Sequence, residues 1–184
     1  MTMEPTQQVL EKIGQLLAAT YPEMVSSLVL CDTSCRTDPR ARPEWDQRIA
    51  VAESAGMEPH VEATIARWFT PGFISSHPEV VDPVRAMIRN TDPLGYAGCA
   101  HAVRNLDVED RLRSIRVPTL VVVGEADPGT PVEAARVIQE AIEGAELVVL
   151  PSASHLSNLE QPRAFNRAMM TFFERVDRSD FVGP

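Results

Sequence analysis

The chain has 184 residues, of which 44% are hydrophobic and 23% are charged. This balance fits one globular domain with its own core, and it argues against a disordered chain or a small disulfide-held scaffold. The formal net charge is −9 and Lys12 is the only lysine. A nucleic-acid partner is therefore not expected, because phosphate neutralisation requires clustered basic side chains.

The apolar runs of the chain are all much shorter than the roughly 20 residues of a membrane span, and no charged-then-apolar segment typical of a secretion signal opens it. We therefore expect a cytoplasmic protein without a membrane partner. The cysteines, Cys31, Cys35 and Cys99, form no C-x-x-C pair, and Cys99 with His101 alone lacks the ligand spacing of a metal site. We expect reduced thiols and no bound metal.

The first predicted elements are an amphipathic helix over about residues 5–20 and a buried strand over residues 28–30. Apolar side chains recur on one face of the helix, and Pro22 ends it. The strand is a short, continuous apolar run, which is typical of a strand covered on both faces.

A long insert over residues 33–116 follows this strand. It contains no strand-like run, and its helical patterns alternate with proline and glycine breaks. The helical segments are residues 45–55, 60–69, 79–89, 96–105 and 109–115. Ligands of open α/β sheets bind beyond the carboxyl ends of the strands, so we interpret this block as a lid, or cap, over those ends. The alternative is a helical subdomain with only a packing role.

Two further strands follow the insert. Residues 120–123 and 147–150 are apolar, valine-rich runs, and a helix lies between them, with Pro131 in its first turn and Gly144 at its end. A last helix starts at Pro162. Because each strand is coupled to a helix, as parallel crossovers require, we expect a parallel sheet.

The predicted fold class is α/β, with about three parallel strands, flanking helices and an all-helical cap insert. Residues 1–32 and 117–184 are expected to form the core, and residues 33–116 the cap.

Two residues with acid–base chemistry follow neighbouring strands. Asp127 lies just beyond the second predicted strand and His155 just beyond the third. At one edge of a parallel sheet the carboxylate can accept the imidazole N–H, hold the tautomer and stabilise the imidazolium. The alternative is ordinary loop chemistry, since an Asp between Gly and Pro residues forms turns and a loop His is commonly solvated.

Several segments, taken in order, carry a resemblance to a known family. They are Ile13-Gly14-Gln15 to Tyr21-Pro22-Glu23, Leu28 to Thr33, Arg67 to Pro71, Arg85-Ala86-Met87, Gly95-Tyr96-Ala97, Ile115 to Leu120, Gly124 to Asp127, and His155 to Pro162. Together they resemble the C-terminal two-thirds of an α/β-hydrolase, and within that superfamily the 3-oxoadipate enol-lactonases.

This resemblance implies roles for particular residues. Asp127 matches the acid, His155 matches the base, and the insert matches the cap that shapes the pocket. Trp68 is expected in the pocket wall, although a Trp on a helix also serves as a core anchor. The implied substrate is a small carboxylated lactone or ester of aromatic catabolism, cleaved without a metal or organic cofactor. The candidate counter-charges for its carboxylate are Arg67, Arg85 and Arg104, each of which is otherwise a solvated helix residue.

The sequence departs from the family at the nucleophile. The family has a Gly-x-Ser-x-Gly elbow directly before the first helix, and here the Ser position falls at or near Gln8, with Val9 and Leu10 in place of glycine. A Gln amide is a poor nucleophile. The strands and the oxyanion-hole loop that precede the elbow in the family are also expected to be missing, so this chain alone should be weakly active or inactive.

Other residues are alternatives for the missing roles. Ser34 and Cys35 follow the first strand at the catalytic end of the sheet and could approach His155 as nucleophiles. Asp32 is an alternative acid, although Asp127 has the stronger match to the family.

The strand over residues 28–30 would be an edge whose former neighbour is lost. About five buried, unpaired backbone groups, at roughly 1–3 kcal/mol each, would match the whole stability of a domain. We therefore expect self-association or a complementing chain. This supports a second hypothesis, in which the chain is a non-catalytic truncated homologue or a fragment that acts as an interaction module.

Overall fold

The computed structural model describes the backbone of residues 5–180 and the side chains of residues 12–178. The predicted sheet is confirmed. β1 (Leu28–Cys31), β2 (Thr119–Gly124) and β3 (Glu146–Leu150) form one parallel sheet in the order β1-β2-β3. All six residues of β2 are buried, as expected for a central strand covered on both faces.

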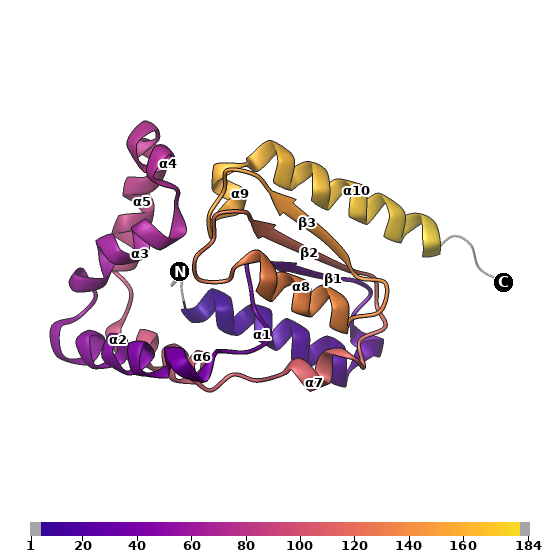
Figure 1. Ribbon diagram of the computed structural model, residues 1–184, viewed down its shortest axis with the longest axis horizontal. Helices are drawn as coiled ribbons and strands as arrows, with labels where there is room; N and C mark the ends of the chain where they lie inside the picture. The colour runs from indigo at the N-terminus through magenta and orange to yellow at the C-terminus, as the bar shows by residue number, and fades with distance from the viewer. Residues whose placement is uncertain (1–4, 181–184) are drawn as a thin grey trace.

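Helices cover both faces of this sheet (Figure 1). On one face, α1 (Pro5–Thr20), α7 (Glu109–Leu112) and α8 (Val132–Ala141) pack over the inward side chains of β1 and β2. On the other face, α10 (Pro162–Asp180) buries Phe172 and Val176 against Leu120, Val122 and Leu150. Alternate side chains of β2 therefore point to opposite faces of the sheet and pack into two separate apolar clusters.

The predicted insert is helical. Its elements are α2 (Arg42–Ala55), α3 (Val61–Trp68), α4 (Pro71–Ser76), α5 (Pro78–Arg89) and α6 (Pro93–Arg104), with short 3₁₀ turns at Pro39–Ala41 and Glu58–His60. These helices lie beyond the carboxyl ends of the strands (Figure 1) and bury an apolar cluster of their own. We call α2 to α6 the helical insert.

The end of the insert differs from the prediction in its packing. Leu112 of α7 and the nearby Ile115 are fully buried in the cluster between the sheet, α1 and α8, not in the cluster of the helical insert. The segment is thus helical as predicted, but its apolar side chains belong to the core. Periodicity shows that a helix has an apolar face without showing which core that face joins.

One side of the core is apolar and uncovered. Ile13, Leu16 and Leu17 of α1 and Tyr21, which directly follows α1, are 51%, 37%, 36% and 51% exposed, and we call these four residues the α1 stripe. Within the described residues, β1 pairs with β2 alone, so its other edge carries no strand. No helix in the described part of the chain has the length and hydropathy needed to cross a membrane.

Candidate active site

The loops after β2 and β3 are in direct contact where the strands end. The backbone N–H of Ala126 donates to the carbonyl of Ala153 at 2.8 Å. Gly124 permits this approach, because a Cβ there would lie 2.2 Å from the carbonyl oxygen of Ser154. A residue with a side chain would force the loops apart, so this glycine brings Asp127 and His155 together.

Asp127 and His155 form a buried hydrogen-bonded pair. His155 Nδ1 lies 2.7 Å from Asp127 Oδ2, so an N–H at this nitrogen donates to the carboxylate. The other oxygen accepts the backbone N–H groups of Gly129 and Thr130 at 2.8 and 3.0 Å, and the Thr130 hydroxyl donates to Oδ2. This is the arrangement that the sequence predicted, with Thr130 as an additional partner.

Burial raises the pKa of Asp127, but the hydrogen bonds from His155 and Thr130 outweigh it and hold this pKa below its usual value. The carboxylate is therefore ionised at neutral pH. An ionised acceptor fixes the proton on Nδ1 and leaves Nε2 as the ring nitrogen that is able to accept a proton.

Trp68 lies beside the ring of His155. Its ring centroid is 6.2 Å from that of His155, with the planes 25° apart, and its backbone carbonyl accepts the N–H of Leu156 at 3.0 Å. Trp68 is 2% exposed and belongs to the apolar cluster of the helical insert. It also lines a cavity of about 230 Å³ together with His155 and Asp127. The two interpretations of Trp68, core anchor and pocket wall, are thus compatible.

Two arginines line this cavity. Arg67 is the only one of the three predicted arginines to do so. Arg85 pairs with Glu62 of α3 and Asp82 of α5, and Arg104 pairs with Asp46.

The second cavity-lining arginine is Arg48, which the sequence analysis missed. Its guanidinium lies 4.8 Å from the ring centroid of Trp45, and it pairs with Glu44. The i, i+3 spacing of Trp45 and Arg48 on one helix face was the available signal.

The described cavity-lining side chains include no Ser, Thr or Cys. Ser34 and Cys35 instead line a neighbouring cavity of about 660 Å³ beside α1 and α8, which shares Trp45 and Gly129 with the first cavity. Burial raises the pKa of the Cys35 thiol to about 11, so it is protonated at neutral pH and a poor nucleophile. Gln8 lies within α1, but its side chain is outside the described residues.

Asp32, the alternative acid, directly follows β1 and accepts hydrogen bonds from two other segments. Its carboxylate accepts the backbone N–H of Gly124 at 2.7 Å and the Ser157 hydroxyl at 2.5 Å. Burial raises its pKa to about 7. Among residues with described side chains, no three His, Cys, Asp or Glu residues gather as a metal site requires.

A parallel sheet covered on both faces, with a buried Asp–His pair on adjacent strand-end loops under a helical insert, has the features of an α/β-hydrolase. The model of the alpha/beta hydrolase family matches residues 5–168, and the chain belongs to this family.

Its relatives include enol-lactonases. The 3-oxoadipate enol-lactonase 2 of Acinetobacter baylyi is 35% identical over 164 residues, which are 89% of this chain and 60% of that protein. The crystal structure of a hydrolase from Pseudomonas aeruginosa PA01 has a TM-score of 0.83 and 38% identity, over 89% of this chain and 61% of that one. The enol-lactonase structure from Burkholderia xenovorans LB400 has a TM-score of 0.85 and 31% identity, over 91% and 63%. The chain thus spans about three-fifths of the length of these relatives.

Proposed function

We propose that this chain carries the acid–base pair and the cap of a carboxylic ester or enol-lactone hydrolase. The observation that supports this is the 2.7 Å hydrogen bond between His155 Nδ1 and Asp127, beside a cavity that Trp68 also lines. In the proposed reaction, His155 Nε2 takes the proton of an attacking hydroxyl as the hydroxyl oxygen bonds to the substrate carbonyl. The imidazolium, stabilised by Asp127, then gives this proton to the leaving oxygen as the carbonyl–oxygen bond breaks.

We propose a small carboxylated lactone or ester as the substrate. The cavity of about 230 Å³ fits a small molecule, and Trp68 and Trp45 give it apolar walls. Arg67 and Arg48 supply positive charge to the same cavity, and a guanidinium binds a carboxylate in bidentate fashion. The enol-lactonase relatives favour this substrate class, and we propose a role in aromatic catabolism from the family resemblance of the sequence.

We place this activity in the cytoplasm. Cys31, Cys35 and Cys99 form no disulfide within the described structure, as is usual for a protein of a reducing compartment.

The nucleophile is the component that the described cavity lacks. In this proposal a second hydrolase segment with a Gly-x-Ser-x-Gly elbow supplies a serine oxygen, and water alone is a slow substitute. Removal of the serine from a serine hydrolase lowers kcat by roughly 10⁶-fold. We therefore expect the isolated chain to be weakly active or inactive.

A complementation module is the second candidate function, and the α1 stripe favours it. These four apolar side chains, on α1 or directly after it, are at least 36% exposed, and α1 packs against β1, whose outer edge pairs with no other strand among the described residues. A segment that adds a strand to β1 would pair this edge and cover apolar surface, at roughly 1.5–3 kcal/mol for each side chain it fully buries. We propose that the elbow-bearing segment binds here, and self-association is the competing occupant.

One reconstitution experiment tests both candidates. The purified chain is assayed for lactone and aryl-ester hydrolysis and for labelling by a fluorophosphonate probe, alone and with a separately produced α/β-hydrolase segment that carries the elbow. We expect slow turnover and no adduct for the chain alone, and restored turnover with an adduct on the added serine in the mixture. His155→Ala should abolish the restored activity, and the exposed Glu143→Gln should retain it.

The outcomes separate the two candidates. Hydrolysis by the chain alone that survives His155→Ala would exclude the proposed base. A compact monomer in light scattering that binds no added segment would exclude complementation, whatever the activity of the chain.

A further inference from the structure

Glu160 lies at the junction of the base loop and the helical insert. It belongs to the short helix α9 (Ser157–Glu160) and is only 8% exposed. One carboxylate oxygen accepts the backbone N–H and the hydroxyl of Thr70, at 2.9 and 2.6 Å. The other oxygen accepts the backbone N–H of Ser154 at 2.5 Å. A single carboxylate therefore joins the residue before His155 to a residue two positions after Trp68.

Further contacts join the same two segments. The Ser154 hydroxyl donates to the carbonyl of Arg67 at 2.7 Å, and the N–H of Leu156 donates to the carbonyl of Trp68. Leu156 is also buried in the apolar cluster of the helical insert, where it is only 2% exposed. The loop that carries the base is thus bonded to the insert on both sides of His155.

We infer that Glu160 is a positioning residue. It holds the segment that carries Trp68 and the loop that carries His155 in a fixed position relative to each other. The inference rests on the proposed function, in which His155 is the base and Trp68 contacts the substrate. The physical reason is that Glu160 accepts from three donors at once. No other side chain in the described structure bonds to both Thr70 and Ser154.

A carboxylate suits this position better than its amide. Hydrogen bonds to an ionised acceptor are about twice as strong as neutral ones, and each carboxylate oxygen can accept two donors. In Glu160→Gln one oxygen becomes an NH₂ donor, which would face either the Ser154 N–H or the Thr70 N–H. One end of the connection is then lost, and a buried donor is left without an acceptor.

The first test measures both ends of the connection without any turnover. Amide hydrogen exchange is followed at Thr70 and Ser154, and Trp68 fluorescence is followed against pH in a Trp45→Phe background. A protonated imidazole quenches a nearby indole, so the pH-dependent step reports the contact of Trp68 with His155, and His155→Ala assigns it. In Glu160→Gln we expect exchange to rise roughly tenfold to a hundredfold at Thr70, Ser154 or both, and the fluorescence step to fall by half or more.

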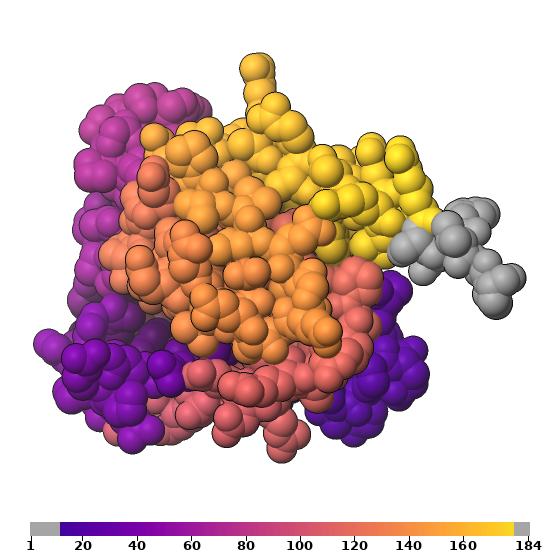
Figure 2. Space-filling view, turned by 45° about the vertical axis from the view of Figure 1, so that its right-hand side comes forward, coloured from indigo at the N-terminus to yellow at the C-terminus, as the bar shows by residue number. Residues whose placement is uncertain are grey.

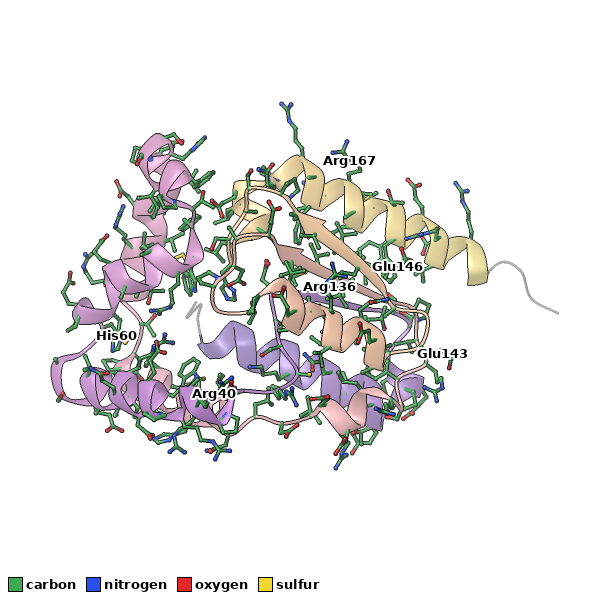
Figure 3. The ribbon with its side chains drawn as sticks, viewed as in Figure 1. Arg40, His60, Arg136, Glu143, Glu146 and Arg167 are labelled. Carbon is green, nitrogen blue, oxygen red and sulfur yellow. The ribbon has the colours of Figure 1, made fainter. Side chains whose placement is uncertain are left out.

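A second variant perturbs one end and reads the other. Thr70→Val removes the hydroxyl donor to Glu160 and leaves both partners of the Glu160–Ser154 hydrogen bond unsubstituted, while Thr70→Ser keeps the hydroxyl. We expect Thr70→Val, but not Thr70→Ser, to raise exchange at Ser154 and reduce the fluorescence step. The control is Glu143→Gln, whose exposed side chain lies at the far end of the core from the helical insert (Figure 3), and it should change neither readout.

Clear results would overturn the inference. If Glu160→Gln folds with unchanged exchange and an unchanged fluorescence step, Glu160 does not position the pair. If Glu160→Gln does not fold, Thr70→Val decides, and unchanged values at Ser154 and Trp68 would show that the ends are uncoupled. Absence of lactone turnover alters none of these readouts, so failure of the proposed function is a separate result.

Discussion

Replacement of Asp32 by Asn should stabilise this protein at neutral and alkaline pH. Asp32 is 4% exposed at the end of β1, and its two oxygens accept from the Gly124 N–H and the Ser157 hydroxyl. In Asp32→Asn the amide oxygen can accept from Gly124 and the amide NH₂ can donate to the Ser157 oxygen, so both contacts are retained. The φ of +48° at this position is one that Asn tolerates well.

The magnitude follows from the proton that the folded state retains. Burial raises the pKa of Asp32 from 3.8 to about 7, so between these values the folded protein binds a proton that the unfolded chain releases. The free energy of unfolding of the natural protein therefore falls as pH rises through this interval. A shift of about 3 units at 1.36 kcal/mol each amounts to about 4 kcal/mol. Asn does not titrate, so the variant avoids this loss.

The assay is urea denaturation of both proteins at about pH 4, 6 and 8, followed by circular dichroism at constant ionic strength. The difference in free energy of unfolding should be near zero at the lowest pH and approach about 4 kcal/mol in favour of Asp32→Asn at the highest. Asp127 has a lowered pKa and contributes stability that is lost at acidic pH, but this is common to both proteins. A difference that does not change with pH, or a variant less stable than the natural protein at pH 8, would refute this account.

Three further substitutions test the packing and the site. Gly124→Ala should lower the free energy of unfolding by roughly 1–3 kcal/mol or more in urea, because its Cβ would overlap the Ser154 carbonyl; an unchanged value would contradict the close approach of the two loops. Phe172→Ala should lower the free energy of unfolding by roughly 3–5 kcal/mol in the same assay. Substitution of the more exposed Phe173 by Ala should lower it by less, and equal decreases would contradict the packing of α10. Asp127→Asn should lower reconstituted lactone turnover by roughly 10⁴-fold, and a loss of less than tenfold would contradict its role.

The sheet was predictable because its residues are apolar on both sides. The runs at residues 28–30, 120–123 and 147–150 all lie within the three strands, whose bounds differ by at most one residue at each end. Two short helices, α4 and α9, were not predicted. Tertiary contacts hold them, since the Thr70 hydroxyl caps α4 and bonds to Glu160 of α9. Such a contact spans 90 residues of sequence and leaves no local pattern.

The candidate site was predictable to the extent that topology determines it. Asp127 and His155 follow adjacent parallel strands, and such strands end at the same edge of the sheet. Arg48 and Glu160 were not distinguishable from the many charged residues on solvated helix faces. Their importance depends on which side chains lie opposite them. The same is true of the difference between Arg67, which lines the cavity, and Arg85 and Arg104, which form ion pairs elsewhere.

The contacts that orient His155, the proposed base, are present without any residue of a nucleophile elbow. Asp127 and Thr130 fix one nitrogen of His155, Trp68 lies beside its ring, and Glu160 joins the base loop to the helical insert. In our proposal the helical insert differs from a lid that closes over a preformed site, because its contacts with the loop after β3 help to place the base. Figure 2 shows the magenta part of the insert beside the orange part of the chain. Loss of an oxyanion donor lowers a rate by roughly 10²–10³-fold, and loss of the serine lowers it by roughly 10⁶-fold. We therefore expect an added segment that binds beside β1 and supplies these two groups to the proposed base to recover most of the rate.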